Sequence, residues 1–295
     1  MSLPKCRRIP ALRSQPMIGW WDGILLLAGL AAACAAGRCG AAAAAEQAEP
    51  APACGGAVIA RGTAKSVIDG RTFVLDDGRT VRLAGIEVPP LAADGGAPPG
   101  GPAARYGLTT LLGGADLLLR QAEPQQTDRY GRLLAYAVAG RDGAERPVQA
   151  DLVAAGLARV AARAGGRACA ATLLDRESAA RRAKLGLWSN PYYDLLNAEY
   201  PADVLAAQGR FALVEGKVVS VRESGATIYV NFGRRWTTDF TVTILKRNAR
   251  NFAAAGLEPK TLAGRRVRVR GWIEERGGPW IEAARPEQIE LTDRQ

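Results

Sequence analysis

Residues 58–86 have the sequence VIARGTAKSVIDGRTFVLDDGRTVRLAGI, which decides the fold expected for this chain. Two Asp-Gly pairs, at 69–70 and 77–78, interrupt apolar runs rich in β-branched residues. Such a pair between two apolar runs is a strong β-hairpin signal, because both residues tolerate the left-handed backbone of a tight turn. The stretch therefore predicts three successive strands, over 58–68, 72–75 and 80–86.

The pattern that follows completes a small barrel. Residues 89–102 are rich in Pro and Gly and predict a loop. After the loop, hydrophobic periodicity predicts a helix over 103–112, strands over 116–120 and 132–139, and helices over 148–156 and 169–184. Three strands, a helix, two strands and further helices are the order of a five-stranded Greek-key barrel of the oligonucleotide/oligosaccharide-binding (OB) type.

A second set of elements in the same order begins after residue 209. It comprises strands over 213–221, 227–232 and 240–245, a helix over 246–255, and strands over 265–274 and 280–284. The predicted fold class is mainly β with helices, as two OB-fold-like five-stranded barrels with helices appended to the first. The predicted segments are a signal peptide or membrane anchor (1–45), a flexible segment (46–56), the first barrel domain (57–190), a linker broken by prolines (191–209) and a C-terminal OB-like domain (210–295).

The first 45 residues have the pattern of an export signal. Basic residues come first, then the apolar run 24–30, then an alanine-rich stretch that ends at Ala45. The apolar run is shorter than the roughly 20 residues of a membrane-spanning helix. We therefore expect an exported protein, periplasmic or extracellular, and an uncleaved leader that anchors the chain in the inner membrane is the alternative.

Two of the five cysteines, Cys54 and Cys169, lie outside the leader. In an oxidising compartment, two remaining cysteines predict a disulfide, which here would tie the start of the first domain to its last helix. A pair of unpaired, buried thiols is the alternative.

Composition excludes several kinds of active site. The chain contains no histidine, so it cannot supply a Ser-His-Asp triad, a Cys-His pair or a His-ligated zinc. Its formal net charge is +10, and residues 209–295 hold sixteen basic and ten acidic residues, a net +6. This surplus favours a polyanion partner for the C-terminal third, with a merely soluble basic surface as the alternative.

Three stretches of the first domain together resemble the thermonuclease (staphylococcal nuclease-like) family. They are IDGRT at 68–72, VRLAGIEVP at 81–89 and DRYGR at 128–132. Shorter matches follow as GLA at 156–158 and GLW at 186–188. The ordered set covers about residues 57–190 and identifies this segment as thermonuclease-like.

The resemblance implies a chemistry. Enzymes of this family hydrolyse phosphodiesters of DNA and RNA with calcium, using two arginines on the phosphate, a glutamate on the attacking water and two aspartates at the metal. Arg82 and Arg132 match the two arginines and are therefore the catalytic and phosphate-binding candidates. Guanidinium suits this role because it is planar, always charged and able to meet two phosphate oxygens at once.

The match is incomplete at the metal and at the base. Glu87 matches one metal aspartate, whereas Arg71 replaces the other and Val88 replaces the motif's threonine. Pro90 matches the glutamate and cannot perform acid–base chemistry. Asp69 and Glu87 remain as candidate metal ligands, although a hard cation prefers several oxygens and is repelled by a neighbouring guanidinium. We expect no cofactor, or Ca²⁺ if the family site survives.

The candidate arginines also have a purely structural interpretation. Arg82 could pair with Glu87 or Asp69, and Arg132 with Asp128. Under that interpretation the side chains hold the barrel together and bind no ligand.

The C-terminal barrel carries the second group of candidates. Alternation with valine places three arginines on one face of the strand 265–274, and two arginines with a tryptophan follow the strand 227–232. The nucleic-acid-binding candidates are Arg234, Arg235, Trp236, Arg266, Arg268 and Arg270, and the candidate stacking surfaces are Tyr229, Phe232, Trp236 and Trp272. Basic faces with interleaved aromatics hold single strands. Alternatively, Glu274, Glu275 and Glu282 neutralise the face and the aromatics belong to the core.

The sequence thus predicts an exported thermonuclease-family protein that binds nucleic acid, phosphate or another polyanion, with hydrolysis lost or altered at Arg71 and Pro90. One alternative is an active, metal-assisted nuclease with non-standard ligands, for which Asp94 is a substitute base. Another is a non-catalytic module of the cell envelope with a protein or glycan partner, because the same barrel type also binds oligosaccharides. The sequence sets no oligomeric state.

Overall fold

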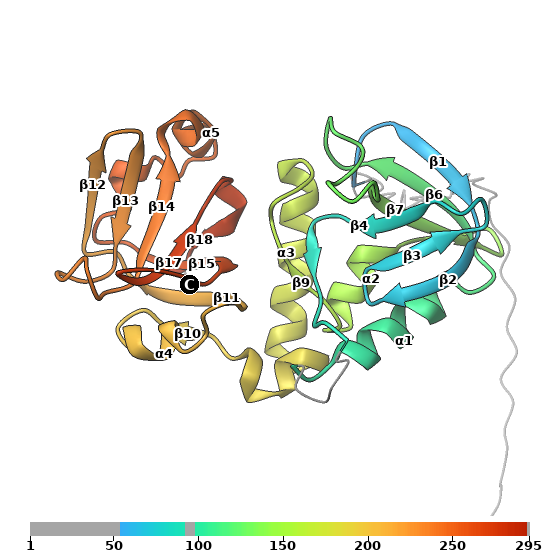
Figure 1. Ribbon diagram of the computed structural model, residues 1–295, viewed down its shortest axis with the longest axis horizontal. Helices are drawn as coiled ribbons and strands as arrows, with labels where there is room; N and C mark the ends of the chain where they lie inside the picture. The colour runs from blue at the N-terminus through green and yellow to red at the C-terminus, as the bar shows by residue number, and fades with distance from the viewer. Residues whose placement is uncertain (1–53, 92–97, 294–295) are drawn as a thin grey trace, which may run out of the picture. The chain divides into compact units, whose positions relative to one another are not determined.

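The computed structural model describes residues 54–91 and 98–293 (Figure 1). The chain divides into two units, 1–48 and 49–295, and all described residues belong to the second. The predicted leader, most of the predicted flexible segment and Asp94 lie outside the described residues. None of the helices in the described part is both long and apolar enough to span a membrane.

The first barrel is one sheet whose strands run in the order β1-β6-β7-β4-β3-β2, with β8 added to β7 (Figure 1). Its strands are β1 (Val58–Gly62), β2 (Ala64–Asp69), β3 (Thr72–Leu75), β4 (Thr80–Leu83), β6 (Asp116–Gln121), β7 (Leu133–Arg141) and β8 (Ala144–Pro147). A single residue, Thr63, separates β1 from β2, so the two ends of this order are halves of one bent strand. The pairing therefore closes on itself, with β4 and β7 as the parallel pair. This is the five-stranded arrangement predicted from the sequence.

The helices of this part cover the barrel and follow it. They are α1 (Gly101–Leu112), α2 (Val148–Ala154) and α3 (Arg167–Arg182), followed by the 3₁₀ turns η1 (Gly186–Ser189) and η2 (Pro191–Tyr193). Two short strands, β5 (Ile86–Glu87) and β9 (Arg159–Val160), pair with each other in a separate antiparallel sheet. The core is formed by the apolar faces of strands and helices, including Phe73, Leu83, Leu108, Leu119 and Leu152.

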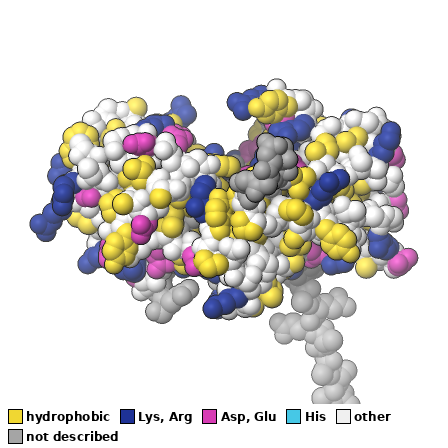
Figure 2. Space-filling model, turned by 60° about the horizontal axis from the view of Figure 1, so that its bottom comes forward, with side chains coloured by type: hydrophobic (Ala, Val, Ile, Leu, Met, Phe, Trp, Pro, Cys, Tyr) yellow, Lys and Arg dark blue, Asp and Glu magenta, His cyan; other side chains and the backbone are white. Residues whose placement is uncertain are grey.

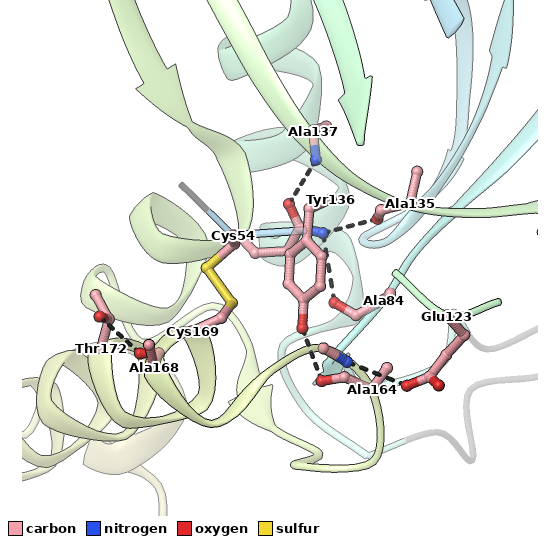
Figure 3. Close-up of a disulfide and its surroundings, with 12 residues drawn as sticks. Cys54, Ala84, Glu123, Ala135, Tyr136, Ala137, Ala164, Ala168, Cys169 and Thr172 are labelled. Atoms are coloured by element: carbon pink, nitrogen blue, oxygen red, sulfur yellow. Dashed lines mark hydrogen bonds between the residues drawn. A yellow bond between two sulfur atoms is a disulfide. The ribbon is translucent and has the colours of Figure 1, made fainter. Parts of the chain in front are cut away.

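Cys54 and Cys169 form a disulfide, as predicted. It joins the chain just before β1 to the first turn of α3, beside the ring of Tyr136 (Figure 3). The Tyr136 hydroxyl donates a hydrogen bond of 2.9 Å to the carbonyl oxygen of Ala164. Gly85, which follows β4, has φ +76°, and a Cβ there would lie 2.4 Å from that hydroxyl, so glycine permits this close approach.

The second barrel repeats the plan with two bent strands. Its elements are β10 (Leu196–Asn197), α4 (Pro201–Leu205), β11 (Phe211–Lys217), β12 (Ser220–Ser224), β13 (Thr227–Asn231), β14 (Thr241–Leu245), η3 (Lys246–Asn248), α5 (Ala249–Ala254), η4 (Pro259–Leu262), β15 (Arg266–Trp272), β16 (Glu274–Arg276), β17 (Gly278–Glu282), η5 (Pro286–Gln288) and β18 (Ile289–Leu291). The strands form two sheets, in the orders β10-β11-β15-β18 and β12-β13-β14-β17-β16. The two sheets are connected because β11 continues into β12 and β15 continues into β16. Again the third and fifth barrel strands, β14 and β17, are parallel.

The segment 191–209, expected as a linker, carries β10 and α4. Pro191 and Pro201 stand in the first turns of η2 and α4, where proline is tolerated because the amide it lacks has no helical partner. Ala198, Val204 and Ala207 join the core of the second barrel. The segment is therefore an ordered part of that barrel's packing.

Candidate phosphate and nucleic-acid site

The strand register gathers three arginines around the β3–β4–β7 region of the first barrel. Thr72, the residue after Arg71, faces Arg82 across the β3–β4 pair. Arg82 in turn faces Leu134 across the β4–β7 pair, and Arg132 directly precedes β7. The electrostatic environment of Arg82 accordingly includes both Arg71 and Arg132. Folding thus brings together the two arginines that the motif comparison selected.

The Arg71 guanidinium contacts Glu87, one of the two carboxylates that the sequence suggests as metal ligands. Its Nη1 donates to a Glu87 carboxylate oxygen and, at 3.1 Å, to the carbonyl oxygen of Ile86. Its backbone N–H donates to Asp69 Oδ1 at 2.8 Å. The side chains of Arg71 and Glu87 are only 15% and 10% exposed. The Arg71 guanidinium therefore supplies the positive charge that neutralises the Glu87 carboxylate.

These residues do not fit a calcium ion. Calcium requires six to eight oxygen ligands, and at this position the Glu87 carboxylate is already engaged by a positive group. In the ranges 54–91 and 98–293, no three His, Cys, Asp or Glu side chains are grouped so as to hold a metal.

Arg82 differs from its neighbours because its side chain makes no hydrogen bond or ion pair with any other described residue. It is partly buried, and its pairing with Asp69 or Glu87, considered above, does not occur. Burial lowers its pKa, as do the charges of Arg71 and Arg132, while Glu87 and Asp69 oppose the shift. Arg82 is thus a partly desolvated cation flanked by two others, an arrangement that an anion would stabilise.

Arg132, in contrast, is held by an ion pair. Its Nε and Nη2 donate to Asp128 Oδ2 at 2.7 and 2.6 Å. Asp128 also accepts the backbone N–H groups of Tyr130 and Arg132, which fixes the turn 128–132. Burial raises the pKa of Asp128, but these hydrogen bonds outweigh burial and the net pKa is lowered. The ion pair considered from the sequence is therefore present for Arg132, with Asp128, and is not found for Arg82 among the described residues.

A cavity of about 220 Å³ adjoins the Arg71–Glu87 pair. The cavity is lined by Asp69, Arg71, Glu87 and Pro90, and Pro90 matches the glutamate of the family motif. Its lining also includes Arg159, Tyr192, Tyr193, Arg210, Phe211 and Trp272. Neither Arg82 nor Arg132 lines this cavity.

The sequence did not indicate the two other arginines that line this cavity, Arg159 and Arg210. The Arg159 guanidinium lies between the rings of Tyr193 and Phe211, 4.9 and 5.0 Å from their centroids, and burial lowers the Arg159 pKa to about 10. Arg210 stacks on Tyr192 with its guanidinium 3.5 Å from the ring centroid. No local motif marks these side chains, because their partners lie in other elements of the chain.

The three arginines of β15 share one face, as the alternation predicts, but that face is not open. Arg270 is fully buried and bonds Glu177 of α3 at 2.8 Å and Glu290 of β18 at 2.5 Å. Arg268 pairs with Glu215 at 2.9 Å, and the more exposed Arg266 reaches the same carboxylate at 3.5 Å. Arg270 is therefore corrected from a nucleic-acid candidate to a structural ion pair, and Arg268 is largely engaged in the same network.

The other predicted group lies apart from β15. Arg234 and Trp236 line a groove of about 790 Å³ beside β12 and β13, and no residue of β15 lines it. Of the four predicted stacking aromatics, Tyr229 and Trp236 line this groove. Phe232 is buried and stacks at 4.9 Å on Phe240, whereas Trp272 lines the cavity near Arg71.

Comparison with known families agrees with the motif analysis. The family described as "Staphylococcal nuclease homologue" matches residues 80–190, which include Arg82, Glu87 and Arg132 but begin after Asp69 and Arg71. A comparison with curated proteins gives no match. The matched segment runs from β4 through α3 to η1, so it contains most of the first barrel and its appended helices. Residues 80–190 are therefore similar to staphylococcal nuclease, and the chain continues into a second barrel of OB-like strand order.

Proposed function

We propose that this chain is an exported nucleic-acid-binding protein whose nuclease-like domain holds a phosphodiester at Arg82 and Arg132 without calcium-dependent hydrolysis. The family match supports a function related to nucleic acids. The remaining parts of the proposal depend on the geometry around the three arginines.

The observation that carries the proposal is the state of Arg82. Its guanidinium is partly buried beside two other arginines and has no counter-ion among the described residues. Desolvating a cation without a partner is costly, and a bound phosphate removes that cost. Arg132 is held at its position by Asp128 and can add a second cation on the same anion.

Two substitutions support the loss of hydrolysis. Arg71 directs a guanidinium at the carboxylate and carbonyl oxygens where the family places its cation. Pro90 stands where a glutamate would activate water, and a proline side chain cannot accept a proton. A site that has lost its metal and its base retains the groups that bind phosphate.

Export is supported by two independent features. The sequence of residues 1–45 has the pattern of a leader. The Cys54–Cys169 disulfide belongs to the kind of bond that persists in oxidising compartments and is rare in the cytosol.

Replacing Arg82 and Arg132 together by alanine is expected to weaken binding to a short labelled single-stranded DNA and to flatten its salt dependence. Each arginine–phosphate interaction that the substitutions remove should reduce the slope of log affinity against log salt by about 0.7. Fluorescence anisotropy at several salt concentrations measures both quantities. The control is Arg61→Ala, which removes an exposed arginine of β1 in the same barrel. Equal affinities and slopes for the double variant and the wild type would contradict the proposal.

The same DNA, incubated with calcium, magnesium or chelator, tests hydrolysis. We expect no cleavage by the wild-type chain in any of the three. Cleavage that disappears in the Arg82→Ala/Arg132→Ala variant would instead support the alternative of an active nuclease with non-standard ligands.

Arg71→Asp is expected to create a calcium site. The change removes the competing cation and adds a carboxylate next to Asp69, Glu87 and the Ile86 carbonyl oxygen. Binding to the folded state alone raises stability with calcium concentration, by about 2.7 kcal/mol at a concentration 100 times Kd. Thermal unfolding over a calcium titration should therefore shift for Arg71→Asp and stay constant for the wild type.

Two control variants separate the causes of such a shift. Arg71→Ala removes the guanidinium without adding a ligand, and Arg61→Asp adds a carboxylate elsewhere in the barrel. Both should give melting temperatures that are independent of calcium. A calcium response of the wild-type chain equal to that of Arg71→Asp would show that the guanidinium does not replace the metal.

A further inference from the structure

We propose that the groove beside β12 and β13 of the second barrel binds single-stranded nucleic acid, with a base stacked on Trp236. The groove is separate from the Arg82 site and shares none of its residues. The inference rests on the proposed function only in taking nucleic acid as the ligand class.

The groove has the size and composition of a site for an extended polymer. It has a volume of about 790 Å³. Strands β12 and β13 pair along one side, where Arg222 faces Tyr229 across the ladder. The loop between β13 and β14 contributes further lining residues, and the charged and aromatic side chains of the lining include Arg222, Glu223, Tyr229, Arg234 and Trp236.

Trp236 is presented by an ordered turn. Its side chain is 73% exposed. The turn is held by Asp239, whose Oδ2 accepts the Arg235 backbone N–H at 2.7 Å and whose own N–H donates to the Arg235 carbonyl oxygen at 2.8 Å. Gly233 is required for this closure, because a Cβ there would lie 2.0 Å from the Asp239 carboxylate. The indole is thus positioned in advance at the edge of the groove, which lowers the entropic cost of stacking a base on it.

The charges around the groove favour an anion. Within the described ranges, the side chains of Arg222 and Arg234 form no hydrogen bond or ion pair. The lining carboxylate, Glu223, is paired with Lys246 at 3.1 Å and Lys260 at 3.4 Å, and hydrogen bonds from these lysines lower its pKa. The carboxylate is therefore already neutralised, and the two arginines remain available for phosphates. Figure 2 shows Lys and Arg side chains along the outer edge of this barrel, on its left.

The second aromatic of the groove is fixed rather than free. The Tyr229 ring meets the Trp280 ring edge-on at 6.0 Å, and Trp280 in turn carries the guanidinium of Arg276 at 4.7 Å. The Tyr229 ring is thus held in place by Trp280, whereas the exposed Trp236 ring is available for a base to stack on. A base can stack on an exposed indole only when it is unpaired, so the geometry selects single strands over duplexes.

The test uses the full chain carrying Arg82→Ala/Arg132→Ala, so that binding at the first site does not contribute. Anisotropy is measured with labelled oligothymidylate, with an abasic strand of the same number of phosphates, and with a duplex. Adding Trp236→Ala should lower affinity for oligothymidylate by roughly fivefold to a hundredfold and leave the abasic strand unchanged. Trp236→Phe should restore most of the loss. Arg222→Ala and Arg234→Ala should each weaken both single strands and reduce the salt slope by about 0.7.

The matched control is Tyr106→Ala, which removes a ring that is 75% exposed on α1 of the first domain. It should leave all affinities unchanged. An equal effect of Trp236→Ala on the abasic strand, tighter binding of the duplex, or no effect of Trp236→Ala at all would overturn the groove proposal.

The two proposals fail separately. If Arg82→Ala/Arg132→Ala weakens binding and Trp236→Ala does not, the groove is refuted and the proposed function stands. If Trp236→Ala weakens binding and the arginine pair does not, the groove stands and the Arg82 site is refuted.

Discussion

Glu177→Gln is expected to lower the free energy of unfolding by about 2–3 kcal/mol, because it removes one of the two carboxylates that neutralise the buried Arg270 guanidinium and leaves only Glu290. Arg270 is fully buried and donates to Glu177 at 2.8 Å and to the Val160 carbonyl oxygen at 3.0 Å. Glu177 is buried as well and also accepts the Val160 N–H at 2.7 Å. These contacts join β15 of the second barrel to α3 of the nuclease-like domain, so the loss should appear in the unfolding of the whole described unit.

Urea unfolding of the wild type and the variant measures the effect. The control is Asp293→Asn, which breaks the exposed Arg265–Asp293 pair and should change stability little, because solvent screens that pair. Replacing both buried partners, as Glu177→Leu/Arg270→Met, should recover part of the loss, because no buried guanidinium remains and Glu290, which loses Arg270, keeps its ion pair with Arg268 at 3.7 Å. If Glu177→Gln costs no more than Asp293→Asn, the buried pair does not hold this junction.

Cys54→Ala/Cys169→Ala is expected to lower the free energy of unfolding by about 4–5 kcal/mol. The bond closes a sequence separation of 115 residues, and in the chain-entropy treatment a loop of about this length contributes nearly 5 kcal/mol by restricting the unfolded chain. The bonded cysteines also fix the chain just before β1 against α3, next to buried Tyr136 (Figure 3).

The measurement is urea unfolding with and without reductant. Reductant should lower the midpoint of the wild type toward that of the double variant and should leave the double variant unchanged. A wild-type midpoint that does not respond to reductant under conditions that reduce Cys54–Cys169 would refute this prediction.

Much of the fold was predictable because its signals are local. The Asp-Gly turns at 69–70 and 77–78 fix the first hairpins, and the structure has strands on both sides of each. Counting cysteines outside the predicted leader left the pair Cys54 and Cys169, and they are bonded. The motif also matches Arg71 to a metal position of the family, since a motif aligns residues one by one.

Other features were not predictable, because they depend on partners distant in sequence. The period of two along β15 shows that Arg266, Arg268 and Arg270 share a face, but it does not show that Glu177 lies opposite. From the sequence alone, Pro191 and Pro201 predict a break between ordered elements. In the structure, each proline lies in the first turn of a helix. A pattern within one strand or helix does not show which charged group of another element will lie next to a given side chain.

The sequence by itself determined the two barrels, the disulfide and the substitutions at the metal and base positions, because these follow from spacing, turn chemistry and residue type. The tertiary structure alone decided how each guanidinium is used. Arg71 satisfies Glu87, Arg132 is tied to Asp128, Arg270 is buried between two carboxylates, and Arg82 has no counter-ion among the described residues. An arginine's role depends on the charge and solvent that surround it, and only packing of distant segments sets both.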